Sequence, residues 1–246
     1  MKVLRKALDE LSIDYDDEKI EKISVYFEEI YKSSKNFNLT SLKSWEEIRD
    51  TLFIRSLRYA YIINTIFSKS NFLNNKNLRI LDLGTGAGIP SIPIKIFYPQ
   101  INLFLTESSS KKCEFLSNTV KKLDLENIKI NNQRAEMLGQ SKSRESFDLI
   151  LTRALAKLPT LAELTIPLLK IGGIVITAKG KYPSKEIHDS NYIINILGVE
   201  KNISEKIDIP SFLPEDNFII WKKIKESPVT FPRRDGVPKK SPILEP

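Results

Sequence analysis

The sequence predicts an α/β fold in which helices cover both faces of a mostly parallel sheet, and three observations lead to this prediction. From Leu78 onward, short apolar segments alternate with longer segments of helical periodicity, as in parallel strands joined by helical crossovers. The first apolar segment, 78–83, ends in a glycine-rich turn. The residues before it, 1–70, have helical spacing only, so we expect a helical N-terminal cap.

Within this cap the sequence predicts two main helices. The first begins at the acidic pair Asp16–Asp17, because acidic side chains favour a helix N-terminus. The second begins near Ser44, with Glu47 as its capping-box partner, and runs to about Phe67. An asparagine-rich linker, 71–77, then leads to the first strand.

The rest of the chain predicts seven strands, four helices and an irregular end. The strands are expected at 78–83, 101–106, 127–131, 147–152, 173–178, near 203–209 and at 217–223. The helices are expected at 89–98, 109–124, 159–169 and 184–197. The last segment, 227–246, contains five prolines and no apolar periodicity, so we expect an irregular arm that cannot bury itself. The predicted parts are therefore a cap (1–70), an α/β domain (71–226) and a basic, proline-rich C-terminal arm (227–246).

Composition excludes several kinds of site. A single cysteine, Cys113, and a single histidine, His188, exclude a disulfide and a Cys/His zinc centre and leave a hydrolytic triad little support. Cys113 lies on the apolar face of a predicted helix and is expected to pack in the core, whereas His188 lies in a polar run and is expected to be solvated. Without a membrane span of ~18 residues or a signal peptide, we expect a cytoplasmic monomer with no metal and no membrane contact.

The charge is uneven along the chain. Of the net charge of +7, the last 26 residues carry +4, from seven basic and three acidic side chains. This distribution favours a polyanionic partner. The alternative is a solubilising end with no specific role.

The spacing of the glycines in the turn points to one class of ligand. A dinucleotide fingerprint, G-x-G-x-x-G, would need its third glycine at Ile89. Here the glycines are Gly84, Gly86 and Gly88, and Asp82 lies two residues before the first. This form resembles the first motif of class I S-adenosylmethionine-dependent methyltransferases. The resemblance implies a Rossmann-like fold with a mostly parallel seven-stranded sheet.

Two later segments fit such a cofactor. Glu107 ends the second strand, where a carboxylate can accept both ribose hydroxyls, as in the related dinucleotide fold. The alternative is that Glu107 only favours the N-terminus of the next helix. The segment Arg134-Ala135-Glu136 follows the third strand, where adenine contacts are expected, although a solvated loop is also compatible with this position.

The methyl acceptor can be narrowed by the groups that are missing. After the fourth strand the chain has Thr152-Arg153-Ala154-Leu155 instead of the Asn-Pro-Pro-Tyr-like motif usual for exocyclic amines. Pyrimidine C5 methylation needs a cysteine nucleophile, and Cys113 lies on the wrong helix. A hydroxyl acceptor needs a general base, for which Lys179 or Lys181 after the fifth strand is possible but a poor candidate. A ring nitrogen such as guanine N7 has a free lone pair and needs positioning only.

At this point the chain resembles the bacterial small-subunit ribosomal RNA guanine-N7 methyltransferases, RsmG or GidB, over nearly its whole length. The segments that carry the resemblance are Asn38-Leu39-Thr40, the run from Asp82 to Pro93 with its Pro-x-x-Pro, Arg153-Ala154 with Lys157-Leu158, the run from Leu168 to Gly180, and Thr230 to Lys240. The resemblance implies that residues 71–226 are a methyltransferase domain. It also implies methyl transfer from S-adenosylmethionine to guanine N7 in 16S rRNA, free or in the small ribosomal subunit.

By matching position, the resemblance assigns residues to two groups. Cofactor contacts fall on Gly84, Ile89, Ala135, Glu136 and Arg153, beside the other turn glycines Gly86 and Gly88 and the ribose ligand Glu107. Candidates for binding RNA are Lys179, Arg153, Arg233, Arg234, Lys239 and Lys240. No residue is assigned to catalysis with certainty, although Arg153 is a candidate for positioning the substrate.

One departure from the family pattern bears on turnover. The family usually has a His-x-x-Asp-Ser motif before the cofactor strand, and alignment at Ser56 puts Leu52 and Arg55 at the histidine and aspartate. Two alternatives therefore stay open. The first is a methyltransferase acting on another RNA or a small molecule. The second is a cofactor-binding and RNA-binding assembly factor without turnover.

Overall fold

The computed structural model describes residues 2–42, 44–67, 72–180, 183–200 and 217–245. Its helices and helical turns are α1 (Lys2–Glu10), α2 (Asp17–Ser34), α3 (Trp45–Glu47), the π-helical turn Ile48–Leu52, α4 (Phe53–Ile66), the 3-10 turn Phe72–Asn74, α5 (Ser91–Phe97), α6 (Ser110–Lys122), α7 (Ala135–Gly139), α8 (Leu158–Thr165), the 3-10 turn Ile166–Leu168, α9 (Ser184–Leu197) and α10 (Val237–Lys240). Its strands are β1 (Arg79–Leu83), β2 (Asn102–Glu107), β3 (Ile128–Asn132), β4 (Phe147–Arg153), β5 (Leu169–Lys179) and β6 (Asn217–Lys222).

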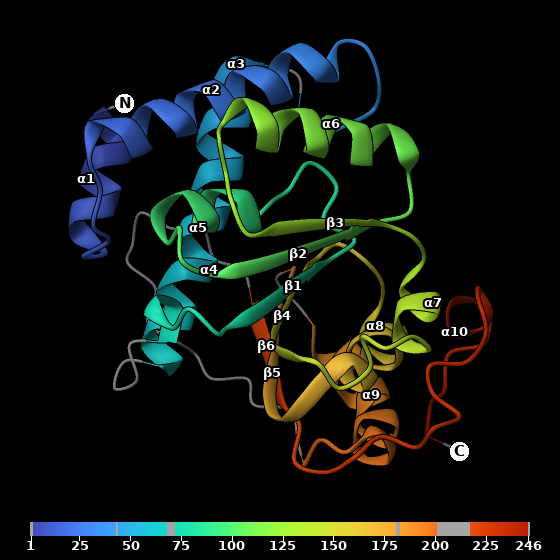
Figure 1. Ribbon diagram of the computed structural model, residues 1–246. Coiled ribbons are helices and arrows are strands. Elements are labelled where there is room, and N and C mark those ends of the chain that lie inside the picture. Colours follow the sequence, from blue (N-terminus) through green and yellow to red (C-terminus); the bar gives the residue numbers. More distant parts are fainter. Residues whose placement is uncertain (1, 43, 68–71, 181–182, 201–216, 246) are drawn as a thin grey trace.

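The strands form one sheet at the centre of the molecule (Figure 1). Their order is β3-β2-β1-β4-β5-β6; the first five are parallel and β6 runs antiparallel to β5. The predicted α/β class with a mostly parallel sheet is therefore confirmed. The strand expected near 203–209, which would be the seventh, lies outside the described residues.

Side chains of each strand alternate between two apolar layers. In β1, Ile80 belongs to the layer that also contains side chains of α2, α4, α5 and α6, whereas Leu81 belongs to the layer that contains α8 and α9. Figure 1 shows α2 and α6 side by side over the first face, and α7, α8 and α9 over the other. Both faces of the sheet are thus covered, as strands with near-continuous apolar runs require.

The predicted helix starts in the cap are confirmed. The Asp16 side chain caps α2 by accepting a hydrogen bond from the Lys19 N–H. Ser44 and Glu47 form a reciprocal capping box at α3. The chain then continues through the π-helical turn into α4, so the second helix has a widened turn near its start.

The C-terminal arm packs against the domain, contrary to the expectation that it cannot bury itself. Pro238 is buried, and its carbonyl accepts a hydrogen bond from the Thr160 hydroxyl of α8. The Pro232 ring lies where a Cβ on Gly139 would stand, 2.5 Å from that position, so only glycine allows this approach. Figure 1 shows the arm in red running beside α7. Polar contacts and proline packing hold the arm, and these produce no apolar periodicity.

Two single-residue predictions are also confirmed. Cys113 is buried in the core-facing side of α6, and the His188 side chain is 74% exposed. Among the helices of the described ranges, none has the length and apolar character that a bilayer crossing needs.

Candidate functional site

The glycine turn after β1 presents bare backbone to its surroundings. The Gly84 N–H donates to the Thr106 carbonyl of β2 at 2.8 Å, which ties the start of the turn to the sheet. Gly86 has φ +61, and no atom lies within 4 Å of the position a Cβ would take. A ligand can therefore approach the backbone of Gly86 directly.

The cap holds the far side of this turn. Tyr26 of α2 is fully buried, and its hydroxyl donates a 2.7 Å hydrogen bond to the Ala87 carbonyl. Ile89, which follows the turn, is also buried. The N-terminal helices therefore contact the turn directly through Tyr26, a residue that was not predicted to lie there.

Glu107 joins the turn to the next helix. Its Oε2 accepts the Gly86 N–H at 3.1 Å, and its Oε1 accepts the Ser109 N–H at 2.9 Å, next to the start of α6. The residue is 9% exposed. The contact with Ser109 agrees with the reading of Glu107 as an acid at a helix N-terminus, while its role as an acceptor for the ribose hydroxyls stays a prediction.

Asp82, at the end of β1, is a buried acid without a basic partner in hydrogen-bond contact. Its Oδ2 accepts from the Thr85 hydroxyl at 2.8 Å, while its Oδ1 has no partner in the described part of the chain. Burial, only partly offset by hydrogen bonding and by the charge of Arg153, raises the pKa of Asp82 to about 7.

The predicted adenine segment lies at the start of α7 and meets the C-terminal arm. Glu136 is 6% exposed, and its Oε1 accepts a 3.1 Å hydrogen bond from the Gly236 N–H. Arg134 and Asp235 approach each other at 3.9 Å in the same place. The arm thus forms the outer wall around Ala135 and Glu136.

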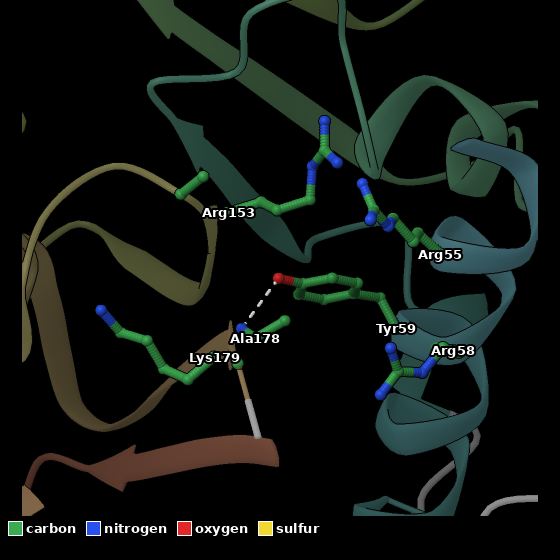
Figure 2. A pocket seen from close by; sticks show the side chains of 8 residues that line it. Arg55, Arg58, Tyr59, Arg153, Ala178 and Lys179 are labelled. Carbon is green, nitrogen blue, oxygen red and sulfur yellow. Dashed lines mark hydrogen bonds between the residues drawn. The ribbon is translucent and has the colours of Figure 1, made fainter. Parts of the chain in front are cut away.

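A basic cavity of about 250 Å³ lies between α4 and the carboxyl ends of β4 and β5 (Figure 2). Its lining residues are Arg55, Arg58, Tyr59, Arg153, Ala154, Ala178, Lys179 and Gly180. Arg153 is close enough to interact electrostatically with both Asp82 and Tyr26, which places this cavity beside the glycine turn.

Tyr59 fixes the floor of the cavity. Its hydroxyl donates to the Thr152 carbonyl at 2.6 Å and accepts the Ala178 N–H at 3.0 Å. The second bond is the dashed line in Figure 2. One side chain of α4 thereby holds the ends of two strands at a set distance. Ala154 has φ +53, a strained conformation for a residue with a Cβ, and it forms the bend beside Arg153.

The predicted RNA-binding residues do not gather in one place. Lys179 donates to Glu186 at 2.8 Å and to the Ala156 carbonyl at 2.7 Å. Arg233 is bound by the 1% exposed carboxylate of Glu163, at 2.7 Å between Nη2 and Oε2. Arg234, Lys239 and Lys240 are exposed on the arm. Of the base candidates, Lys181 lies outside the described residues.

Comparison with known proteins decides the family. Residues 19–210 match the family model described as rRNA small subunit methyltransferase G. The chain is 33% identical to the ribosomal RNA small subunit methyltransferase G of Bacillus cereus over 240 residues, which cover 97% of each chain. It is 36% identical to the protein of that name from Desulforamulus reducens over 241 residues, 98% of this chain and 97% of that one.

The chain belongs to this family. S-adenosylmethionine is accordingly its cofactor, and its reaction is methyl transfer. Solved structures of low identity have the same fold. A mutant of MtNAS in complex with S-adenosylmethionine has TM-score 0.51 and 12% identity, over 91% of this chain and 77% of that one. MtNAS in complex with MTA and tNA has TM-score 0.53 and 14% identity, over 85% and 71%.

In this methyltransferase the two positions that depart from the family motif have different surroundings. Leu52 is 1% exposed and belongs to the apolar layer that the N-terminal helices share with one face of the sheet. Arg55 lines the basic cavity. Arg58 and Tyr59 were not predicted as site residues. Both are polar side chains on a helix face that is otherwise apolar, and this pattern could have indicated them. Arg58 is itself 1% exposed.

Proposed function

We propose that this protein transfers a methyl group from S-adenosylmethionine to N7 of a guanine in 16S rRNA. One observation carries the choice of acceptor. In its described lining, the cavity beside the glycine turn has arginine, lysine and tyrosine side chains but no carboxylate or imidazole. Guanine N7 needs no deprotonation before it accepts a methyl group, so a cavity without a base suits it.

Two candidate groups of this cavity, Tyr59 and Lys179, are already engaged. Burial raises the pKa of the Tyr59 hydroxyl above its usual range, and its proton is engaged by the Thr152 carbonyl. Lys179 donates to the Glu186 carboxylate and to the Ala156 carbonyl. The chain's contribution to the reaction is therefore orientation of the acceptor and exclusion of water.

The chemical groups of the cofactor match the residues of the turn region. It carries an electrophilic methyl group on a sulfonium centre, together with an α-ammonium group, a carboxylate and an adenosine. The open backbone at Gly86 admits it, and the unpartnered Oδ1 of Asp82 suits a cationic group. The Glu107 carboxylate accepts the ribose hydroxyls. Gly84, Gly88 and Ile89 shape the turn, and Ala135 and Glu136 contact adenine.

Arg153 then holds the cofactor's carboxylate at the border between the turn and the cavity, and it also positions the acceptor. The exposed cations of the arm, Arg234, Lys239 and Lys240, and the cavity-lining Lys179 lie on the RNA side. Arg233 contributes through the arm's fold, because Glu163 engages its guanidinium.

The test is transfer of a labelled methyl group to small ribosomal subunits, and to naked 16S rRNA, from a strain that lacks the gene. Nucleoside analysis of the product should give 7-methylguanosine. Label in another nucleoside would instead make the protein a methyltransferase on a different acceptor. Cofactor binding with no transfer to either RNA would identify a non-catalytic assembly factor.

A further inference from the structure

The basic cavity brings the side chains of Arg55 and Arg153 together, with no acidic side chain among its described lining residues. Arg55 of α4 and Arg153 of β4 direct their guanidinium groups into the same space (Figure 2). Neither side chain forms a hydrogen bond or ion pair with any described residue, and no acidic side chain is among the described residues that line the cavity. Arg58 also lines the cavity, but it is fully buried, packs over the Phe218 ring at 4.8 Å and has contacts of its own, which sets it apart from Arg55 and Arg153.

Such an arrangement is costly unless an anion completes it. Buried charges in proteins are normally paired, because desolvation is not offset otherwise. Burial first, and then the like charge of Arg55, lower the pKa of Arg153 below its usual range. Other partly buried cations of the described residues have an acid or carbonyl groups as acceptors, such as Glu186 for Lys179, Glu163 for Arg233 and the Pro99 and Ile101 carbonyls for Lys95. The cavity therefore has the electrostatics of an oxyanion site.

We propose that Arg55 binds a phosphodiester group of the RNA next to the acceptor guanine. This assignment rests on the proposed function, whose acceptor the same cavity receives. Guanidinium groups match phosphate oxygens with two parallel hydrogen bonds, and phosphate contacts set the register of a bound nucleic acid. A phosphate held there fixes the nucleotide while N7 faces the methyl donor.

The geometry separates this phosphate from the cofactor's own carboxylate. Both are oxyanions, and both could meet arginines in this cavity. Arg153 extends from β4 and interacts with Asp82 and Tyr26 at the turn, so it belongs to the cofactor side. Arg55 extends from α4, outside the turn.

The decisive variant is Arg55→Ala, because Arg55 is only half-buried. We expect it to weaken binding of unmodified small subunits roughly tenfold, the loss of one charge-assisted contact. The slope of log affinity against log salt should fall by about 0.7 to 0.9. The dissociation constant for S-adenosylmethionine should stay unchanged, whereas Arg153→Ala should raise it. Arg55→Lys should keep the salt slope but recover only part of the affinity, because lysine lacks the fork.

Lys222→Ala is the matched control. Lys222 is exposed at the end of β6 and pairs with Ile174 in the middle of β5, whereas the cavity-lining Lys179 pairs with Asn217 at the other end of β6. Lys222→Ala therefore removes an equal charge away from the cavity. We expect it to leave RNA affinity within twofold of the wild-type value. A loss equal to that of Arg55→Ala would mean general electrostatic attraction and would overturn the site.

Inorganic phosphate gives a second, RNA-free readout. Thermal unfolding in sodium phosphate, against sodium chloride of equal ionic strength, should show stabilisation of the wild-type protein that Arg55→Ala lacks. Unchanged RNA binding and unchanged phosphate stabilisation in Arg55→Ala would overturn the proposal. A loss of S-adenosylmethionine affinity in Arg55→Ala would assign the arginine to the cofactor's carboxylate instead.

These outcomes are distinguishable from failure of the proposed function. If the wild-type protein makes no 7-methylguanosine but Arg55 still governs phosphate and RNA binding, the acceptor assignment fails and the anion site stands. If methylation proceeds and Arg55→Ala behaves as the wild type in both assays, the anion site fails and the function stands.

Discussion

The C-terminal arm and the basic cavity are both rich in cationic side chains, yet they treat charge in opposite ways. In the arm, the guanidinium of Arg233 forms a two-pronged contact with the buried Glu163. Arg144 donates to the Phe231, Ser227 and Pro228 carbonyls, so a second arginine fastens the arm from the domain side. In the cavity, Arg55 and Arg153 face each other with no acid between them among the described residues.

This difference indicates where a bound polyanion gains the most binding free energy. A cation already bound to a carboxylate offers a phosphate little, because the existing contact must be broken first. Two neighbouring guanidinium groups without an acidic partner are stabilised by any oxyanion, since the ligand also offsets their mutual repulsion. The density of basic residues along the sequence is highest in the arm, but the unmatched charge is in the cavity.

The largest expected effect tests the arm as a structural element. Arg233→Ala should lower the free energy of unfolding by about 3 to 5 kcal/mol, because it leaves the Glu163 carboxylate buried without its partner. Arg234→Ala, at the exposed neighbouring position, should change it by less than about 0.5 kcal/mol. Denaturant unfolding of both variants measures the difference. Equal, small effects would mean that the arm contributes nothing to the fold.

The next largest effect is expected on cofactor affinity, at Glu107 beside the glycine turn. Glu107→Ala should weaken S-adenosylmethionine binding by about 1.5 to 3 kcal/mol, because a charge-assisted hydrogen-bond acceptor is removed. Glu114→Ala removes the same charge from an exposed position of α6 and should bind the cofactor normally. Calorimetric titration measures both. Retained affinity in Glu107→Ala would remove this residue from the ribose site.

The pH dependence of stability tests Asp82, a buried acid near the cavity that has no basic partner in hydrogen-bond contact. Glu163 at the arm, in contrast, is paired with Arg233. The folded-state pKa of Asp82, about 7, exceeds the ordinary value, so the folded protein holds a proton that the unfolded chain has lost. Its contribution to stability is therefore complete below about pH 4 and is lost as the pH rises toward and through 7.

Relative to Asp82→Asn, the wild-type protein should lose about 2 kcal/mol of unfolding free energy between pH 5.5 and 7.5. Unfolding curves of the two proteins across this range measure the difference, in which the other titrating groups cancel. A constant difference would place the pKa of Asp82 near its usual range. Cofactor affinity should rise over the same interval, because the ionised acid suits a cationic ligand.

The smallest expected effect compares the two basic regions directly in RNA binding. The double variant Lys239→Ala, Lys240→Ala removes exposed cations without disturbing Arg233. It should reduce the salt slope of RNA binding in proportion to the phosphates lost, at most about two contacts, while affinity at low salt falls only modestly. An unchanged slope would make the arm a purely structural element and leave RNA binding to the cavity.

Local signals explain why the sequence predicted much of the fold. The glycine turn, the capping box at Ser44 and the strand-end position of Glu107 each depend on neighbouring residues, and all three appear in the structure as expected. The strand positions agree to within a residue or two for most strands, although β5 begins at Leu169 instead of at 173. Its first residues form a bulged edge that lacks the apolar run of the remainder.

Contacts between distant residues explain what the sequence did not predict. Arg233 and Glu163 are 70 positions apart, and no periodicity links them. The cavity joins α4 to the ends of two strands about 100 residues later in the chain, so its charge exists only in the folded protein. The π-helical turn before α4 also alters the angular position of Arg55 and Tyr59, which a regular helical pattern cannot anticipate.

The hydrogen bond from Tyr26 to the Ala87 carbonyl has a consequence for how the cofactor is received. With that carbonyl engaged from the cap side, rotation of the peptide between Ala87 and Gly88 would break a buried hydrogen bond, which favours the present conformation of the turn. Binding then orders few additional degrees of freedom, and less of the contact energy is offset by lost entropy. The N-terminal helices thus help to hold the turn in its binding conformation. Their loss would slow and weaken cofactor binding, even if every side chain that contacts the cofactor were still in place.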